Sequence, residues 1–339
     1  MNPLVSILIP FYNEEKNILK ALESCLNQSY GNIEIILVDD FSTDSSVENI
    51  KVVTDSRVKI LQSSNKGVGF ARNTALKAAK GEFFAFLDAD DELDKEFVSI
   101  SLKEIQEKKC DIAVFGSKVF DRNKNEIRNT KNTSKFEVLS GTDALKMLYS
   151  HSVIASVWAK LFRTSLVKDT EFEVDFVFED KPFMTELFLT ANQVYVGQTK
   201  LYLHFANPNS ITRSKLKEKR IRDSTTSFFV EQSLLTSHGA TREIVLLSFN
   251  YQINIMVDIF LMLWLDRKLI DSKKLLTVFV DDLKRIIDRS EELSLDFSLK
   301  RKLLFTIMKS SKQIGMSIPV LIVKTYFKSQ YRFIKKIKA

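Results

Sequence analysis

Apolar runs alternate with amphipathic segments in the first hundred residues, and this limits the folds that the chain can adopt. Four runs rich in β-branched or aromatic residues are predicted strands: residues 5–9, 33–38, 58–62 and 83–87. The segments between them have apolar residues at helical spacing and are predicted helices: residues 16–28, 44–53 and 68–80. Strands that alternate with helices predict an α/β domain with a doubly wound, mostly parallel sheet.

Polar or flexible residues mark two ends of these helices. Asn13 is the predicted N-cap of the first helix, because its side-chain oxygen can accept from unpaired backbone N–H groups. Gly81 is the predicted C′ residue of the third helix, because glycine tolerates the left-handed conformation found there.

Carboxylates follow two of the predicted strands directly. Asp39 and Asp40 end the second strand, while Asp88 and Asp90 follow the fourth. Ligands of a parallel sheet collect at the carboxyl ends of its strands. The turn after the first strand, residues 10–15, has no glycine-rich phosphate loop, which argues against a dinucleotide dehydrogenase or a P-loop NTPase.

Asp88 and Asp90 lie one residue apart and form a candidate site for a hard cation. Mg²⁺ and Mn²⁺ accept one or two protein carboxylates and keep their other positions for water and phosphate oxygens. Such an ion would neutralise the charge that develops on a diphosphate leaving group. The alternative is a solvated turn, since aspartate is common after strands.

The loops around Asp40, Lys66 and Arg72 are candidates for holding a nucleotide. A carboxylate at Asp40 could accept hydrogen bonds from a base N–H, but the same acidic run also suits the start of a helix. Gly67 allows close approach of the backbone beside Lys66. Arg72 could clamp a phosphate, or it could be a surface residue of its helix.

Four motifs stand in a fixed order in this part of the chain: residues 5–14 (VSILIPFYNE), 38–44 (VDDFSTD), 65–73 (NKGVGFARN) and 87–91 (LDADD). Together they closely resemble family 2 glycosyltransferases of the GT-A fold. The resemblance continues more thinly through residues 158–162 (WAKLF), 178–183 (FEDKPF) and 209–213 (NSITR). These motifs are similar to those of bacterial capsule, lipooligosaccharide and exopolysaccharide enzymes.

The resemblance implies a metal-dependent, inverting transfer of a sugar from a nucleotide diphosphate, usually UDP, to an acceptor hydroxyl. It assigns six residues to the nucleotide-sugar pocket: Pro10, Tyr12, Glu14, Asp40, Arg72 and Asp88. Lys66 is added to this set because it lies on the loop before Arg72. Among them, Asp40 would contact the uracil and Arg72 would lie near the donor. Asp88 and Asp90 would hold the sugar and a Mn²⁺ or Mg²⁺ ion, and Asp180 would be the general base.

Three further side chains have two interpretations each. Glu179 either raises the pKa of Asp180 or pairs elsewhere as a structural residue. His204 is a further metal or phosphate ligand, or a hydrogen-bonded strand histidine. Trp158 either stacks on an acceptor sugar or packs in the core.

The sequence predicts three parts: residues 1–100 and 101–214 as the nucleotide-sugar-binding and acceptor-binding halves of the GT-A domain, and residues 215–339 as a helical C-terminal region. The longest apolar stretch, residues 253–265, is shorter than the ~20 residues that a bilayer crossing needs. No signal peptide is recognised, and two scattered cysteines fit a reducing compartment. We therefore expect a cytoplasmic protein that is soluble or peripheral to the inner face of the cell membrane.

The charge of the chain is unevenly distributed. The net charge is +7, but residues 297–339 contain 11 Lys and Arg residues and no Asp or Glu, so residues 1–296 have a net charge of −4. Residues 320–338 predict a helix with one apolar and one basic face, typical of an interfacial helix on anionic lipid. The alternative is a helix that packs on its own domain with a solvated basic face.

The leading hypothesis is an inverting glycosyltransferase that uses a UDP-sugar to extend a glycan or lipid-linked oligosaccharide of a bacterial surface. The alternative of another class is a non-catalytic, membrane-docked sugar-binding or nucleotide-binding scaffold of the same fold. A nucleic-acid partner is not expected, because the basic stretch contains no recognisable reading module.

Overall fold

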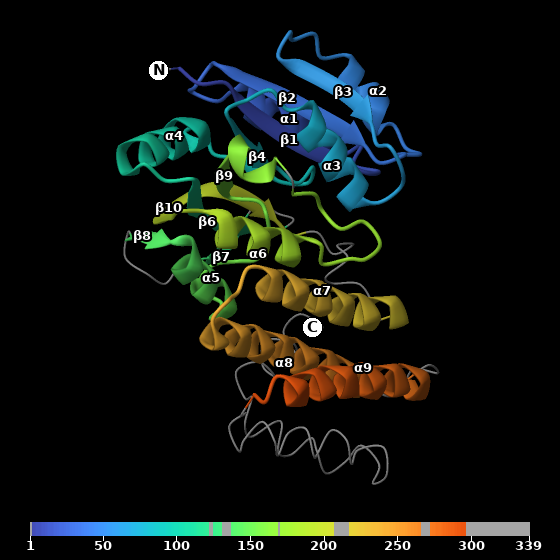
Figure 1. Cartoon of the computed structure of the whole chain (residues 1–339). Helices are drawn as coiled ribbons and strands as arrows, with labels where there is room; N and C mark the ends of the chain where they lie inside the picture. The colour runs from blue at the N-terminus through green and yellow to red at the C-terminus, as the bar shows by residue number, and fades with distance from the viewer. Residues whose placement is uncertain are drawn as a thin grey trace. The chain divides into compact units, whose positions relative to one another are not determined.

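The computed structural model describes residues 2–121, 125–130, 137–168, 170–206, 217–265 and 272–295. The chain divides into two compact units, Met1–Asn207 and Pro208–Ala339. The first is an α/β unit and the second is helical (Figure 1). The division of the sequence at residues 100 and 214 stays a prediction.

The α/β unit begins with four parallel strands, which we call the parallel half of the sheet. They are β1 (Val5–Phe11), β2 (Ile33–Asp39), β3 (Val58–Gln62) and β4 (Phe83–Phe86), and they lie in the order β3-β2-β1-β4. Three helices alternate with them: α1 (Ile18–Leu26), α2 (Ser46–Lys51) and α3 (Val68–Ala78). The four predicted strands and the three predicted helices are confirmed, each helix being shorter than expected.

Both predicted helix ends are wrong for local reasons. Asn13 has a φ of +54° and lies before α1, whose N-cap residue is Asn17. The side chain of Asn13 instead accepts from the backbone N–H of Thr43 (2.8 Å). Gly81 lies beyond the extended C-cap residue Ala79, and a Cβ on Gly81 would be 2.6 Å from the carbonyl oxygen of Phe83. Gly81 thus permits close packing of backbone rather than a helix cap.

The remaining strands form a mixed half, in which antiparallel β9 (Lys160–Arg163) separates β4 from β6 (Ile112–Phe120). Strand β10 (Gln193–Phe205) runs parallel to β6, and its other neighbours, β5 (Glu92–Leu93) and β8 (Glu137–Ser140), are antiparallel to it. The mixed half also includes β7 (Glu126–Thr130), α4 (Phe97–Lys108), α5 (Gly141–Tyr149), the 3₁₀ turn η1 (Thr164–Val167) and α6 (Asp180–Thr190). The sheet as a whole is therefore mostly, but not entirely, parallel.

One hydrophobic core runs through both halves of the sheet. It joins fully buried residues of β1, β2 and β4 to residues of β6 and β9, such as Ile7, Leu37, Ala85, Ala113 and Leu161. Because β1, β2 and β4 are buried along most of their length, they read as continuous apolar runs, as expected of parallel strands covered on both faces. Polar residues follow the carboxyl ends of these strands: Tyr12 after β1, Asp40 after β2 and Asp88 after β4.

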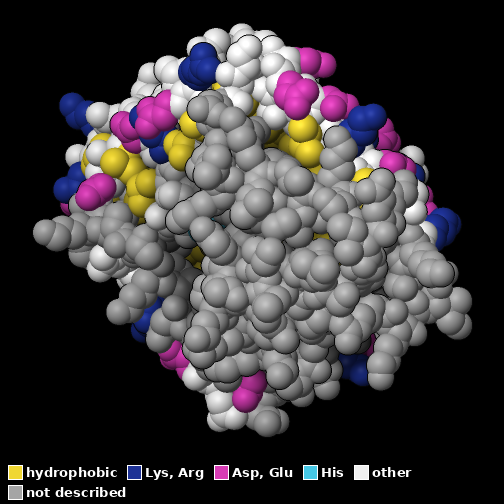
Figure 2. Space-filling view, turned by 90° about the horizontal axis from the view of Figure 1, so that it is seen from below, with side chains coloured by type: hydrophobic (Ala, Val, Ile, Leu, Met, Phe, Trp, Pro, Cys, Tyr) yellow, Lys and Arg dark blue, Asp and Glu magenta, His cyan; other side chains and the backbone are white. Residues whose placement is uncertain are grey.

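The helical unit contains α7 (Glu218–Ser237), α8 (Arg242–Leu265) and α9 (Ser272–Glu292). These helices share a core of apolar residues, including Phe228, Phe249, Phe260 and Phe279. On the described surface seen in Figure 2, side chains of both charge signs are interspersed. The predicted amphipathic helix over residues 320–338 lies outside the described residues.

Helix α8 contains the apolar stretch of residues 253–265 and is longer than it. The helix continues on the N-terminal side of that stretch, and its segment Arg242–Phe260 is long and apolar enough to cross a bilayer, with a mean hydropathy of 1.2. Half of this segment is buried inside the protein. Core helices of soluble proteins reach the same length and hydropathy.

Candidate active site

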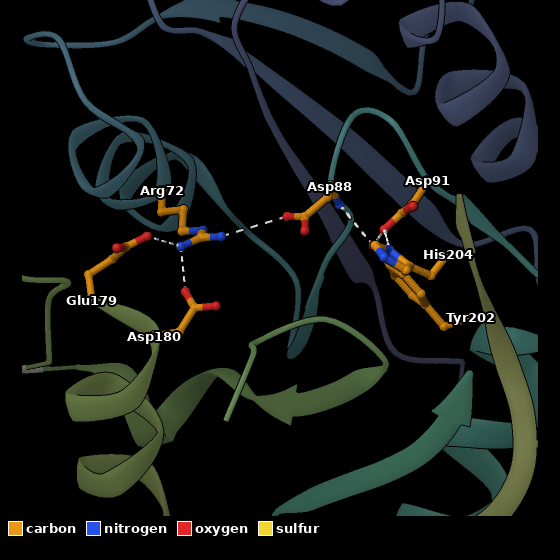
Figure 3. Close-up of polar contacts among 7 residues, drawn as sticks. All are labelled: Arg72, Asp88, Asp91, Glu179, Asp180, Tyr202 and His204. Atoms are coloured by element: carbon orange, nitrogen blue, oxygen red, sulfur yellow. Dashed lines mark hydrogen bonds and ion pairs between the residues drawn. The ribbon is translucent and has the colours of Figure 1, made fainter. Parts of the chain in front are cut away.

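Arg72 is the centre of a buried ionic cluster (Figure 3). Its guanidinium pairs with Glu179, with Asp180 Oδ1 at 2.5 Å and with Asp88 Oδ1 at 3.6 Å. The rings of Phe86 and Phe172 lie 5.9 and 5.3 Å from the guanidinium carbon. With only 7% of its side chain exposed, Arg72 is not the surface helix residue that was the alternative interpretation.

Three elements that are distant in the sequence bring these charges together. Arg72 lies on the buried face of α3, and Asp88 follows β4 at the carboxyl edge of the sheet. Glu179 is the N-cap residue of α6 and Asp180 is in its first turn, where the helix dipole favours negative charge. The preceding residue, Phe178, has a φ of +84°, a conformation that costs energy in a non-glycine residue. Because both residues pair with Arg72, Asp180, the predicted base, lies near Asp88 of the predicted metal-binding motif.

Carboxylates outnumber cations in this cluster. Burial raises the pKa of Asp88 to about 7, against the opposing charge of Arg72, and Asp91, Asp180 and Asp90 reinforce the rise. Burial also raises the pKa of Glu179, which is the closest partner of Arg72. The Asp88 side chain is still 33% exposed, so a ligand can reach it. An accessible carboxylate with several acidic neighbours fits a divalent cation, which would offset their repulsion.

The candidate ligands of such a cation are Asp88 and Asp90. Within the described ranges, no group of three or more His, Cys, Asp or Glu side chains is arranged to hold a metal ion. Two carboxylates completed by water and phosphate oxygens suit Mg²⁺ or Mn²⁺ better than a cage made entirely of protein ligands.

Asp91, the third carboxylate of the same run, has a different role. It is buried and accepts hydrogen bonds from Tyr202 Oη (2.8 Å), His204 Nδ1 (3.0 Å) and the Phe205 N–H (2.8 Å). Tyr202 also lies 3.2 Å from the N–H of Asp88 (Figure 3). Asp91 therefore connects β10 to the loop that contains Asp88 and Asp90.

The bond between His204 Nδ1 and Asp91 orients the imidazole ring of His204. This bond uses Nδ1 and not Nε2. Burial lowers the pKa of His204, but the hydrogen bond and charge of Asp91 outweigh it, and the net pKa is raised. Trp158 stacks on His204 and on Tyr202, with ring centroids 5.7 and 4.6 Å apart. Trp158 is thus packed against the site, partly buried, at the edge of the core.

The candidate nucleotide residues lie at the ends of β1 and β2. Pro10 is buried within β1, and Tyr12, just after this strand, is 54% exposed. Glu14 accepts from the Asn17 amide at 2.7 Å, and burial raises the pKa of Glu14. These residues lie at the carboxyl edge that the sequence predicted, and their contact with a nucleotide stays a prediction.

Asp40 and Lys66 form the adjoining part of this edge. Asp40 accepts from the N–H of Gly67 at 2.7 Å, which ties the end of β2 to the loop before α3, and burial raises the pKa of this carboxyl. The ammonium of Lys66 lies 5.8 Å from the ring centre of Phe41. Gly67 has a φ of +126°, so this tight entry to α3 needs glycine.

Two buried side chains near the site were missed in the sequence. Lys160 is fully buried, and its Nζ donates to the carbonyl oxygens of Ser156 (2.6 Å) and Ile154 (3.2 Å). Asn73 bonds the backbone of Phe172. Lysine is almost always exposed, so nothing in its local pattern indicates a buried ammonium. Asn73 follows Arg72 in one of the quoted motifs, and its place there was the only signal.

Residues 6–170 match the family described as Glycosyl transferase family 2. A similar curated protein is the uncharacterized glycosyltransferase EpsJ of Bacillus subtilis, 33% identical over 64% of this chain and 65% of EpsJ. Glycosyltransferase GlyG of Streptococcus pneumoniae is 29% identical over 66% of this chain and 77% of GlyG. The chain thus spans about two thirds of EpsJ.

Two solved structures extend the likeness to the fold. A crystal structure of Staphylococcus aureus TarS residues 1–349 in complex with UDP-GlcNAc has a TM-score of 0.68, with 21% identity over 98% of this chain and 90% of that one. The mannosyltransferase PcManGT from Pyrobaculum calidifontis, in complex with GDP-Man and Mn²⁺, has a TM-score of 0.54 and 15% identity, with 100% of this chain and 87% of that one covered. The α/β unit has the GT-A fold, and its residues 6–170 belong to glycosyltransferase family 2.

Proposed function

We propose that this chain is an inverting glycosyltransferase that moves a sugar from a UDP-sugar to a hydroxyl of a glycan or lipid-linked glycan during synthesis of a bacterial surface polysaccharide. The observation that carries the proposal is the ionic cluster in which Asp88 and Asp180 share Arg72. The cluster brings an acidic residue from the edge of the parallel half close to a carboxylate from the mixed half. An in-line displacement needs a base on one side of the sugar and charge stabilisation on the other.

Asp180 is the proposed general base. Its carboxylate takes the proton of the acceptor hydroxyl while the hydroxyl oxygen forms a bond to the anomeric carbon. The bond from that carbon to the diphosphate oxygen breaks, and its electron pair leaves with UDP. One displacement inverts the configuration at the anomeric carbon. Asp180 is suited to this role because 23% of its side chain is exposed, whereas its neighbour Glu179 is buried against Arg72.

Asp88 and Asp90 are the proposed ligands of a Mn²⁺ or Mg²⁺ ion. When bound, the ion would supply positive charge to the diphosphate leaving group. The excess of carboxylates over cations around Asp88 supports this assignment. Arg72 would hold the carboxylates of both halves in a fixed relation during the reaction, and Lys66 would add positive charge beside the phosphates.

Pro10, Tyr12, Glu14 and Asp40 are the proposed lining of the uridine pocket. An exposed aromatic ring at Tyr12 offers a surface for a base, and Asp40 lies on the same sheet edge. A UDP-sugar is the proposed donor class because TarS, a relative in fold, is described in complex with UDP-GlcNAc. A TarS sequence that is 30% identical over 59% of this chain is named a β-N-acetylglucosaminyltransferase.

The proposed acceptor is a surface glycan, free or linked to lipid, and the proposed location is the cytoplasm at the inner face of the membrane. The name of one relative, the poly(ribitol-phosphate) β-N-acetylglucosaminyltransferase TarS of Staphylococcus aureus, supports a polymeric acceptor. The basic residues 320–338 support membrane contact by their composition.

A screen of UDP-sugars with the purified full-length chain tests this function. We expect release of UDP from at least one UDP-sugar in the presence of Mn²⁺ or Mg²⁺, and loss of release after chelation. Turnover that persists unchanged without metal would contradict the role of Asp88 and Asp90. Undetectable binding of UDP by calorimetry, together with no turnover, would favour the non-catalytic scaffold instead.

A further inference from the structure

The segment that delivers Glu179 and Asp180 to the site is irregular in structure. We call residues 170–178 the strap; it connects the region of η1 to α6 and forms no helix or strand. Such a segment cannot position a side chain through its own backbone ladder. Its position therefore depends on what it packs against.

One face of α3 contacts the first half of the strap, residues 171–174. Gly69, Asn73 and Lys77 recur every four residues and so lie on the same side of the helix. At Gly69 the two backbones are in close contact, because a Cβ there would be 2.6 Å from the carbonyl oxygen of Glu173. At the far end, Lys77 pairs with Glu171 at 2.8 Å, but both side chains are more than half exposed.

Asn73 makes the central contact on this face. Its Nδ2 donates to the carbonyl oxygen of Phe172 at 2.9 Å, and its Oδ1 accepts from the N–H of Phe172 at 2.7 Å. One buried side chain thus satisfies both polar backbone groups of a residue 99 positions away. This pairing fixes both the position and the direction of the strap at Phe172.

Phe172 transmits that position to the ionic cluster. Its ring stacks on Phe183 in the first turns of α6, with centroids 3.8 Å apart and an interplanar angle of 11°. The same ring lies 5.3 Å from the guanidinium carbon of Arg72. Phe172 therefore touches both the helix that begins at Asp180 and the cation that Asp180 pairs with.

We propose that Asn73 is a positioning residue for the general base: by clamping the backbone of Phe172, it holds the strap, the start of α6 and Asp180 in register with Arg72 and Asp88. This inference deepens the proposed function and rests on it. The side chain of Asn73 bonds the backbone of Phe172 and acts on Asp180 through it.

Asn73→Ala and Gly69→Ala test the inference by different routes. The first removes both hydrogen bonds, and the second pushes the strap away through the Cβ that would meet Glu173. Displacement of a catalytic group by about 1 Å costs about 100-fold in rate, so we expect kcat for UDP release from the UDP-sugar accepted by the wild type to fall about 100-fold in each variant. The Kd for UDP should stay within about 2-fold, since the nucleotide residues do not move.

Lys77→Ala is the matched control. It removes the exposed contact between the same helix face and the same strap, and kcat should stay within about 2-fold of the wild type. Loss of UDP binding in parallel with kcat in Asn73→Ala and Gly69→Ala would show general damage and overturn the positioning role.

A double-mutant cycle separates a positioning role from a structural one. If Asn73 acts through Asp180, the loss of about 100-fold should shrink to less than about 3-fold in an Asp180→Asn background, because no base is left to position. Losses that multiply would overturn the inference. Full turnover in Asp180→Asn alone would instead overturn the proposed function, so the two failures are distinct.

Amide hydrogen exchange gives a readout that needs no substrate. In Asn73→Ala the N–H of Phe172 and the first turn of α6 should exchange faster, while β1 and β2 should remain protected. Unchanged exchange at Phe172 would contradict the clamp.

Discussion

The parallel and mixed halves of the sheet hold their charged residues in different ways. In the parallel half, Asp39 and Asp40 accept from backbone N–H groups of the adjoining loops, at Ser42 and Gly67. In the mixed half, Lys160 and Glu179 are buried, and the partner of Glu179 is 107 residues away. The carboxylates at the end of β2 are thus held by nearby loops, whereas the buried charges of the mixed half depend on contacts between distant segments. We expect changes at the strand ends of the parallel half, such as Tyr12, to affect nucleotide binding. Changes in the mixed half, or on the face of α3 that contacts the strap, should affect turnover and stability.

The largest effect should come from Asp180→Asn in the mixed half. Loss of a general base costs about 10²–10⁴-fold, so kcat for UDP release should fall about 1,000-fold while the Kd for UDP stays within about 2-fold. Steady-state kinetics and calorimetry on the same preparations measure both. Glu173→Gln, which changes an exposed carboxylate in the strap, is the control and should be close to wild type.

Lys160→Met should produce the largest loss of stability. The variant leaves the carbonyl oxygens of Ile154 and Ser156 without the donor at Lys160, which should lower the free energy of unfolding by about 2 kcal/mol at pH 7. Urea unfolding measures this change. Lys59→Met, at an exposed position on β3, should change the free energy of unfolding by less than about 0.5 kcal/mol. Equal losses in the two variants would contradict the difference between the halves.

Lys160 should also make stability depend on pH. Burial lowers the pKa of Lys160 to about 7, against the opposing charge of Asp180. The unfolded chain keeps this proton up to about pH 10, so between these values the unfolded state binds more protons and stability rises with pH, by at most ~1.4 kcal/mol per unit. Lys160→Met lacks this contribution, so its deficit relative to wild type should widen from pH 7 to pH 9. A deficit that stays constant with pH would show that Lys160 remains charged in the fold.

A smaller effect on binding should come from Tyr12→Ala in the parallel half. Stacking of a base on an aromatic ring contributes about 1–3 kcal/mol, so the Kd for UDP should rise about 10-fold while kcat at saturating donor changes little. Tyr12→Phe keeps the ring and should bind UDP as the wild type does. If Tyr12→Ala lowers kcat instead, the two halves do not divide binding and turnover as proposed.

The parallel half could be predicted from the sequence because its signals are local. Buried parallel strands appear as continuous apolar runs, and Asp88 and Asp90 follow one of them directly. The mixed half could not be predicted in the same way. Strand β9 has four residues between two long-range neighbours, and Lys160 within it is charged but buried.

In the candidate site, too, the sequence identified single residues but not the contacts between distant ones. The motifs named Arg72 and Asp180 separately, but no local pattern shows that they pair, since they are 108 positions apart in the sequence. The sequence also grouped Asp91 with its acidic neighbours, whereas the structure uses it to orient His204. The predicted helix caps at Asn13 and Gly81 were wrong because these residues make tertiary contacts instead, with Thr43 and with Phe83.

The configuration of the product tests the central claim most directly. If Asp180 activates the acceptor for one in-line displacement, the sugar transferred or released from an α-linked UDP-sugar must first appear as the β-anomer, which ¹H NMR distinguishes before mutarotation. A β-configured initial product that disappears in Asp180→Asn is the predicted result. An α-configured initial product would show retention and contradict the account.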